Sequence, residues 1–462
     1  MDRVLILIVL LVAVFIWLSK EGVRLSYDKF TEFLVSVYVF SCCFVRLSFP
    51  LYTLPFEHQF GPFGSAFRLE MCHIMIFILL WVISQRKNIT FTKIKPLPLF
   101  ILLFYILYTM LNPFNIVKSS SCVALNYILS YLVFMYLLTS CCSVENIIKG
   151  VYKGLSMTVI LHFVLLLAYT LTGAYSIVVL LNADAVTRRG ASPATFGHPN
   201  ALGAYASFYL MFFVACFFTG FKKRDSLVYA LIALFVIYMS ASRSALMASA
   251  FGIMVLVILY VFRKYSLFNV QILLKGVLPV GIVLLLLYIF TPLSDMFSAS
   301  SDADDMVLAR YMHYYCAYEI FSDHPLVGVG LNTHLKYLQE NSALVDIETM
   351  FEGNDIWMPE DFMFTNPIHN IWLIMLTEFG LIGVIPIVSF IVYFYATFKK
   401  KIKESNSLYY NIAIITALGI LSCMLVHGNS DWTLYTPTML NISLFFLFIA
   451  ETSKFSQKNI TV

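Results

Sequence analysis

One histidine stands where the chain passes from its longest polar segment into an apolar one. His369 lies in Asn366-Pro367-Ile368-His369-Asn370, directly before a run rich in Ile, Leu and Trp. An imidazole with an ordinary pKa of about 6.5 accepts and releases protons near neutral pH. We therefore predict that His369 is a general base. The alternative is a structural role, in which His369 caps backbone carbonyls beside Asn370 at a helix start.

Four arginines are expected at or near the outer surface, where positive charge is disfavoured: Arg188, Arg189, Arg243 and Arg310. Arg243 lies in a short polar break, 240–244, between two apolar runs. Charged residues at membrane depth are rare and usually mark a substrate path. One guanidinium group can donate two parallel hydrogen bonds to the oxygens of a phosphate, and it stays charged at every relevant pH. We predict that the arginines bind a phosphate or diphosphate. The alternative is that each snorkels to lipid headgroups or pairs with an acidic residue.

The amino-acid composition indicates the kind of environment in which these residues lie. Of the 462 residues 60% are hydrophobic and only 12% are charged, and the mean hydropathy is +0.84. Soluble chains carry about 25% charged residues. Apolar runs long enough to cross a bilayer recur along the chain, so we predict an all-α, polytopic integral membrane protein.

The predicted spans follow from the apolar runs. We place them at 4–18, 30–49, 70–84, 97–112, 121–139, 154–175, 200–219, 226–240, 244–262, 271–291, 379–397, 408–427 and 434–450. Connections rich in Lys and Arg, such as 222–224 and 399–403, mark the cytoplasmic side. The alternation of sides is consistent from residue 85 onward, but thirteen spans put the first residue outside. An interfacial or re-entrant position for one of the first two segments would resolve this, so twelve or thirteen spans are expected.

Three parts are expected along the chain. Residues 1–291 form an N-terminal bundle that includes an outer loop at 176–199, and residues 367–462 form the C-terminal spans. Between them, 292–366 is a large periplasmic loop that holds thirteen of the 26 acidic residues but only two basic ones. Its aromatic residues predict helices packed on the membrane mouth. The alternative for this loop is a solvated acidic lid without sugar contacts.

A Gly- and Pro-rich stretch precedes the span at 200–219. Pro199 is suited to the first position of a helix, and the free amides at such a helix start can assist an anion. His198 and Asn200 flank this proline. We expect both to contact substrate, although a lone histidine such as His198 more often has a structural hydrogen-bonding role.

Four blocks of sequence, taken in order, resemble the O-antigen ligase and Wzy-type polymerase superfamily. They are Arg-Gly followed by Gly-His-Pro-Asn-Ala-Leu-Gly at 189–203, Ser-Arg-Ser-Ala-Leu at 242–246, Arg310 continuing to Asp-His-Pro-Leu-Val-Gly-Val-Gly at 323–330, and Pro-Ile-His-Asn at 367–370 continuing to Glu-Phe-Gly-Leu-Ile-Gly at 378–383. The first 150 residues are similar only in being a stack of apolar helices.

The resemblance implies a GT-C-like glycosyltransferase fold in the bacterial cytoplasmic (inner) membrane, with the active site facing the periplasm. It implies an undecaprenyl-diphosphate-linked glycan as donor, and a glycan or lipid A-core as acceptor. By motif position, Arg189, Arg243 and Arg310 correspond to the family's essential arginines and His369 to its essential histidine. The doubled Arg188-Arg189 leaves open which of the two acts.

The residues also suggest a mechanism. A polyprenyl diphosphate is a good leaving group once arginines neutralise it, so no metal and no cofactor are expected. His369 would take the proton of the acceptor hydroxyl during an inverting displacement. We expect weaker glycan contacts from a set of polar and aromatic residues: His198, Asn200, Tyr311, Tyr314, Trp357 and Asn370.

Several functions compete. We favour a polymerase of O-antigen, capsule or exopolysaccharide repeat units, which allows a chain-length regulator as partner and no nucleic acid. The alternative is an O-antigen ligase that transfers the glycan to lipid A-core. A lipid-linked sugar transporter or flippase predicts internal repeats, which the sequence lacks. A peptidoglycan glycosyltransferase would rely on an outer aspartate, such as Asp302, Asp304 or Asp305.

Overall fold

The structure is a computed structural model. It describes residues 27–44, 48–53, 63, 66–84, 96–172, 192–196, 198–264, 301–341, 366–405, 407–433 and 436–452. In chain order its elements are α2 (Tyr27–Ser41), β1 (Ser48–Thr53), β2 (Ala66–Glu70), α3 (Met71–Ser84), α4 (Pro96–Leu111), α5 (Lys118–Cys141), α6 (Val144–Thr172), α8 (Pro199–Thr219), α9 (Lys223–Met239), α10 (Arg243–Lys264), α13 (Ser301–Asp323), α14 (His334–Glu340), α17 (Ile371–Glu404), α18 (Leu408–His427) and α19 (Pro437–Glu451).

The long apolar runs are helices, which confirms an all-α polytopic membrane protein. Within the described ranges, α5, α6, α8, α18 and the part of α17 at Ile371–Phe398 are long and apolar enough to cross a membrane. Shorter apolar helices lie at Met71–Ser84, Arg243–Ile258 and Met439–Glu451. The spans expected at 4–18 and 271–291 lie outside the described residues, so the total of twelve or thirteen stays a prediction.

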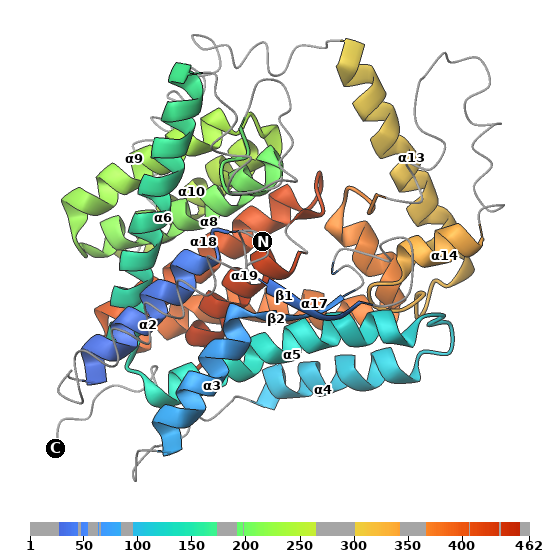
Figure 1. Cartoon of the computed structure of the whole chain (residues 1–462), viewed down its shortest axis with the longest axis horizontal. Helices are drawn as coiled ribbons and strands as arrows, with labels where there is room; N and C mark the ends of the chain where they lie inside the picture. The colour runs from blue at the N-terminus through green and yellow to red at the C-terminus, as the bar shows by residue number, and fades with distance from the viewer. Residues whose placement is uncertain are drawn as a thin grey trace.

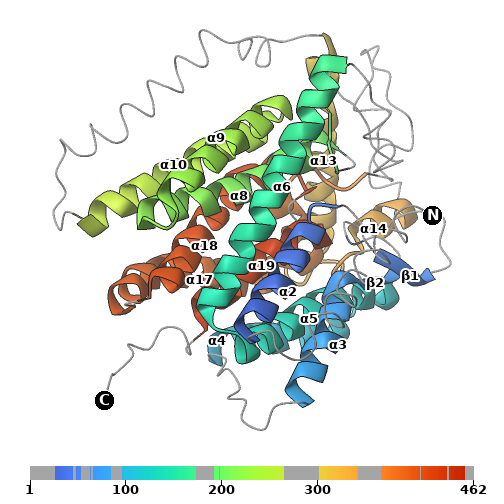
Figure 2. The same ribbon diagram turned by 60° about the vertical axis from the view of Figure 1, so that its left-hand side comes forward.

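Helices α8 and α18 form the centre of the bundle (Figure 1 and Figure 2). In each of them 78% of the most apolar window is buried, against 39% for α17. α8 packs against α9, α10 and α18, and α18 also packs against α19. A helix that is apolar on all sides belongs in such an interior. α17 instead exposes an apolar stripe at three- and four-residue spacing, at Leu381, Ile385, Val388 and Val392, as expected of a helix with one face toward lipid.

Two glycines bring α2 and α6 into close contact. A Cβ on Gly150 would lie 2.6 Å from the Glu32 carbonyl oxygen, and one on Gly154 would lie 2.7 Å from that of Ser36. Small residues four positions apart let two membrane helices approach backbone to backbone. The pair α2–α6 therefore packs more closely than larger side chains would permit.

The N-terminal part differs from the sequence expectation in one respect. The span expected at 30–49 is the helix α2, which ends at Ser41, and the chain then enters an antiparallel hairpin of β1 and β2. Pro50 lies opposite Arg68, next to an irregularity in the pairing between Pro50 and Tyr52. Proline has no N–H to donate, so within a strand it is tolerated at such bulges.

The large segment between α10 and α17 contains helices, as predicted. α13 stands at the edge of the molecule with α14 at its lower end (Figure 1). Helix α17 begins at Ile371, before the span predicted at 379–397, and the Asn370 side chain caps it: Oδ1 accepts hydrogen bonds from Trp372 N (2.9 Å) and Leu373 N (3.2 Å).

Helix α17 is interrupted at Gly380, whose φ of 59° is outside the helical range. The loop before α14 supplies the missing backbone partners. Val329 N and Gly330 N donate to the carbonyls of Thr377 and Glu378, each at 2.9 Å. In return, Leu381 N and Ile382 N donate to the carbonyls of Pro325 (2.9 Å) and Leu326 (3.1 Å). Irregular backbone at membrane depth persists only where protein satisfies it, so this loop is a structural part of the broken helix.

Candidate active site

The turn after α18, residues 427–431, is where the starts of several helices meet. Ile371 N, the first amide of α17, donates to the Gly428 carbonyl at 2.8 Å. The Asn429 carbonyl accepts two hydrogen bonds, one from Asn370 Nδ2 (3.2 Å) and one from the hydroxyl of Tyr314 on α13 (3.2 Å). The turn therefore fixes α13 relative to the start of α17.

The same turn holds the starts of α8 and α10. Asn200 Nδ2, in the first turn of α8, donates to Asp431 Oδ2 at 2.7 Å. Ser244, the second residue of α10, has its Oγ 3.2 Å from His427 Nε2. Gly203 lets these two helices approach, because a Cβ there would lie 2.8 Å from Ala245 Cβ.

Three helix N-termini thus point toward one place. They belong to α8, α10 and α17. Side chains cap two of these helices: His198 Nδ1 accepts from Asn200 N at 3.1 Å at the start of α8, and Asn370 caps α17. A helix start carries partial positive charge and unpaired amides, so it favours an anion. Their convergence makes this region electrostatically suited to a phosphate group.

His369 is paired with a second histidine. His369 Nδ1 lies 3.1 Å from His313 Nδ1, and the ring planes are inclined by only 12° with centroids 4.8 Å apart. His313 is 1% exposed, whereas His369 is partly exposed. Burial, and to a smaller extent the nearby positive charge of His369, His334 and Arg310, lowers the pKa of His313 to about 3. His313 is therefore a neutral imidazole at physiological pH, and His369 is the member of the pair that solvent can reach.

Asp431 supplies a negative charge to the same region. It is 2% exposed, and its Oδ1 accepts a hydrogen bond from Thr433 N at 2.8 Å. Burial by itself raises the pKa of Asp431, but the charges of His427, His369 and His198, together with the Thr433 amide, lower it below the ordinary aspartate value. Asp431 is thus an ionised carboxylate that stabilises a protonated imidazole nearby. We call His198, His313, His369, His427 and Asp431 the histidine cluster.

Two of the predicted arginines lie beside this cluster. Arg243 is the first residue of α10, adjacent in sequence to Ser244, which contacts His427. Arg310 lies on α13 three residues before His313, and its charge acts on that imidazole. Residues three and four apart share a helix face, so Arg310, His313 and Tyr314 lie on the same side of α13. Arg188 and Arg189 lie outside the described residues.

The other predicted contacts have mixed positions. Tyr314 is 38% exposed, while Asn370 is buried and serves as a helix cap. Asn200 holds Asp431, and His198 caps α8. Trp357 lies outside the described residues, and Tyr311 is part of α13 but its side chain is not described. A glycan contact by any of these residues stays a prediction.

The sequence reasoning missed three members of the cluster. His313 lies within the predicted acidic loop, and only its spacing of three from Arg310 could have drawn attention to it. His427 and Asp431 flank Gly-Asn-Ser at the end of an apolar span. Ionisable residues at such a position are candidates for function, and that signal was available.

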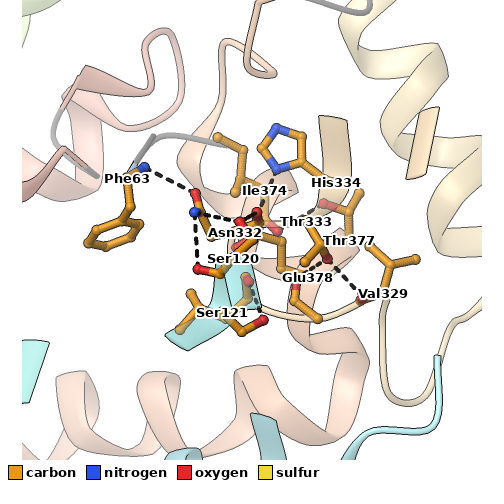
Figure 3. A network of polar contacts seen from close by, with 12 residues as sticks. Phe63, Ser120, Ser121, Val329, Asn332, Thr333, His334, Ile374, Thr377 and Glu378 are labelled. Atoms are coloured by element: carbon orange, nitrogen blue, oxygen red, sulfur yellow. Dashed lines mark hydrogen bonds and ion pairs between the residues drawn. The ribbon is translucent and has the colours of Figure 1, made fainter. Parts of the chain in front are cut away.

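A separate buried network anchors the loop before α14 (Figure 3). His334 Nδ1 lies 2.7 Å from Glu378 Oε1 on α17, and both side chains are 0% exposed. Asn332 accepts from Phe63 N at 3.1 Å and donates from Nδ2 to Ser120 Oγ on α5 at 2.9 Å. Ser121 Oγ donates to the Leu331 carbonyl. We call Ser120, Ser121, Asn332, His334 and Glu378 the loop network; it ties this loop to α5 and α17. Within the described part of the chain, no group of three or more His, Cys, Asp or Glu side chains is arranged to hold a metal ion.

Fold and site together define a polytopic α-helical membrane protein with a histidine- and arginine-bearing site at converging helix starts. Residues 228–388 match a family model described as O-antigen ligase. Within this range the match confirms the resemblance of the sequence blocks at 242–246, 310–330 and 367–383 to the O-antigen ligase and Wzy-type superfamily. It includes Arg243, Arg310, His313 and His369. A search of curated proteins found no match to the chain.

Proposed function

We propose that the protein is a membrane glycosyltransferase that polymerises undecaprenyl-diphosphate-linked oligosaccharide repeat units at the outer face of the bacterial cytoplasmic membrane. The donor is one lipid-linked glycan, and the acceptor is a hydroxyl of another. The reaction inverts the anomeric carbon and needs no metal ion.

One observation carries the proposal: a partly exposed imidazole, His369, lies 3.1 Å from the neutral His313 and near enough to the ionised Asp431 for the two charges to interact. A general base needs a free lone pair and an environment that tolerates its protonated form. Because Nδ1 faces His313, we assign the acceptor hydroxyl to Nε2. Asp431 compensates the charge that appears when Nε2 takes a proton.

The proposed displacement has a defined balance of bonds. The acceptor hydroxyl gives its proton to His369 Nε2, and its oxygen forms a bond to the anomeric carbon. The bond between that carbon and the diphosphate oxygen breaks on the opposite face, and its electron pair leaves with the lipid diphosphate. The attack from the opposite face inverts the configuration.

The leaving diphosphate is held by positive groups that require no metal. Arg243 and Arg310 supply guanidinium charge, and the starts of α8, α10 and α17 supply amide dipoles. Groups that are in place before charge develops stabilise a transition state without reorganisation, and one such donor contributes about 10²–10³-fold in rate. We assign Arg188 and Arg189 the same role in holding the diphosphate, and this assignment rests on the sequence blocks alone.

A ligase is the second candidate. The family model that matches residues 228–388 is described as O-antigen ligase, and the same donor chemistry serves an acceptor hydroxyl on lipid A-core. The residues around His369 are equally suited to either hydroxyl, so the acceptor separates the two functions.

The experiment compares a deletion strain complemented with wild type, with His369→Ala or with His73→Ala. His73 is a matched control, because it is also a partly buried, hydrogen-bonded histidine but lies on α3, where its ring contacts Glu70 N and Ser130 Oγ. Membrane levels are measured by immunoblot and surface glycan by gel. We expect wild-type glycan with His73→Ala and none of full length with His369→Ala.

The glycan pattern of the deletion strain distinguishes the two acceptors. Single repeat units attached to lipid A-core, without longer chains, support the polymerase. Polymer that accumulates on the carrier lipid, with no attached glycan, supports the ligase instead. Full-length glycan made by a membrane-inserted His369→Ala protein would contradict both functions as proposed.

A further inference from the structure

We propose that His313 is a positioning residue that accepts a hydrogen bond from His369 Nδ1–H and thereby keeps the lone pair of His369 on Nε2. The inference rests on the proposed role of His369 as general base and adds a residue to it. Neither the matched family nor the sequence blocks assign a role to His313.

The contact between the two rings allows only two arrangements of protons. A neutral imidazole carries one N–H donor and one acceptor nitrogen. The two Nδ1 atoms are 3.1 Å apart, so one of them must carry the proton and the other must accept it. Either His369 donates to His313, or His313 donates to His369.

Only the first arrangement leaves His369 able to act as a base. If His313 donated, His369 Nδ1 would be the acceptor and its proton would be on Nε2, where the acceptor hydroxyl must bind. If His369 donates, Nε2 has the lone pair. The hydrogen bond on one ring nitrogen sets the state of the other, as it does in other histidine sites.

The surroundings of His313 keep it from competing for the proton. Its ring is 1% exposed, and burial holds its pKa at about 3, with the charges of His369, His334 and Arg310 acting in the same direction. The charged and titratable groups whose charges act on the pair come from three places: Arg310 on α13, His334 on α14, and Asp431 just after α18. The proton taken from the acceptor therefore stays on His369.

The pair also helps after proton transfer. The imidazolium of His369 has two N–H donors, and the one on Nδ1 still meets an acceptor on His313. A hydrogen bond from a charged donor is about twice as strong as one between neutral groups. The contact thus strengthens as the transition state is reached, which is the requirement for a contribution to kcat.

Two substitutions separate positioning from packing. Asn at position 313 places an amide oxygen close to the site of Nδ1 and can accept the same hydrogen bond. Phe keeps a flat ring against His369 but accepts nothing. We expect His313→Asn to retain kcat within about tenfold of wild type, and His313→Phe to lower kcat by about 10²-fold, within the range for general-base catalysis. KM should change little in either variant.

The direct readout is the tautomer of His369, by ¹⁵N NMR of the full-length protein labelled on histidine and held in lipid nanodiscs. The His369 signals are assigned by their loss in His369→Ala. His162→Phe is the control, since it also removes a buried, hydrogen-bonded imidazole, on α6. We expect protonated Nδ1 and unprotonated Nε2 in wild type, His162→Phe and His313→Asn, and a mixture of tautomers in His313→Phe.

The spectrum does not depend on glycosyl transfer, so the two proposals fail separately. Full transfer activity of His369→Ala would show that His369 is not the general base. The tautomer of His369 in the wild-type protein could still be measured. A wild-type spectrum with the proton on Nε2 would overturn the role of His313 even if His369 is the base. An unchanged tautomer and unchanged kcat in His313→Phe would overturn it as well.

Discussion

The histidine cluster and the loop network each contain a buried histidine and a carboxylate, yet they differ in what surrounds these groups. In the loop network, His334 and Glu378 are both 0% exposed, and the neighbouring Asn332 and Ser121 bond to backbone atoms. In the histidine cluster, His369 is partly exposed. The contacts join side chains at the ends of α8, α10 and α18, and join His369 before α17 to His313 in the middle of α13.

The difference indicates that the loop network maintains the structure, whereas the histidine cluster is suited to proton exchange. Buried polar groups that bond to backbone fix a loop in place, because each lost bond leaves an unsatisfied atom. Polar side chains that meet one another at helix ends, with one ring open to solvent, retain a site where a proton can be exchanged. We therefore expect substitutions in the loop network to reduce stability and substitutions in the histidine cluster to reduce turnover.

The largest stability effect should come from Glu378→Ala. Removing one partner of a buried pair costs about 3–5 kcal/mol, because His334 is left without its 2.7 Å contact. Glu378→Gln keeps an acceptor oxygen and should be milder. Thermal unfolding in detergent measures both variants. A melting temperature for Glu378→Ala equal to that of wild type would show that this pair does not stabilise the fold. It would contradict the expected difference between the loop network and the histidine cluster.

Arg243→Ala should reduce turnover rather than stability. Loss of one preorganised positive donor costs about 10²–10³-fold in kcat/KM, measured with purified protein and a lipid-linked repeat unit. Arg243→Lys keeps the charge without the paired donors and should recover part of the rate. Arg224→Ala, near the start of α9, is the matched control and should match wild type. Equal rates for Arg243→Ala and Arg224→Ala would exclude Arg243 from the site.

The break in α17 can be tested with two glycines that both have a positive φ, although ψ is −172° at Gly380 and 6° at Gly220. Ala at Gly380 (φ 59°) would collide with the Leu326 backbone, whereas Ala at Gly220 (φ 84°) has no atom within 4 Å. Both substitutions introduce strain of about 1–3 kcal/mol, but only Gly380→Ala also displaces the loop at 325–330. Its unfolding temperature should fall further than that of Gly220→Ala. Equal shifts would show that the loop is not held at the break.

The smallest effect is a pH slope. The pKa of His313 is lowered to about 3 in the folded protein, so between about pH 6.5 and 3 the unfolded chain binds a proton that the folded one does not. Stability from this group is complete above pH 6.5 and declines as the pH falls, by at most about 1.4 kcal/mol per pH unit. His313→Phe should flatten the acid side of the unfolding curve. An identical slope in the variant would mean that His313 is not the group responsible.

Much of the fold was predictable because lipid imposes a simple rule on sequence. Apolar runs must be long enough to cross the bilayer, and α18 coincides with the predicted span at 408–427. The hairpin of β1 and β2 and the break at Gly380 were not predictable. Both depend on partners distant in sequence: Arg68 opposite Pro50, and the loop at 325–330 beside α17.

The site was predictable in part for the same reason. Arg243 and His369 stand out locally, since each is an ionisable residue at a boundary between apolar and polar chain, and Arg310 stands out as one of two basic residues in the acidic segment 292–366. His313 and Asp431 gain their meaning only from contacts across 56 residues to His369 and across 231 residues to Asn200. Sequence spacing along one chain does not contain that information.

The most direct test of the account is the rate at which purified protein in nanodiscs transfers a lipid-linked repeat unit, measured for wild type, His369→Ala and His73→Ala. A general base contributes about 10²–10⁴-fold. The account predicts a loss of that size for His369→Ala, with an unfolding temperature like that of wild type, and no loss for His73→Ala. Transfer by His369→Ala at the wild-type rate would contradict it.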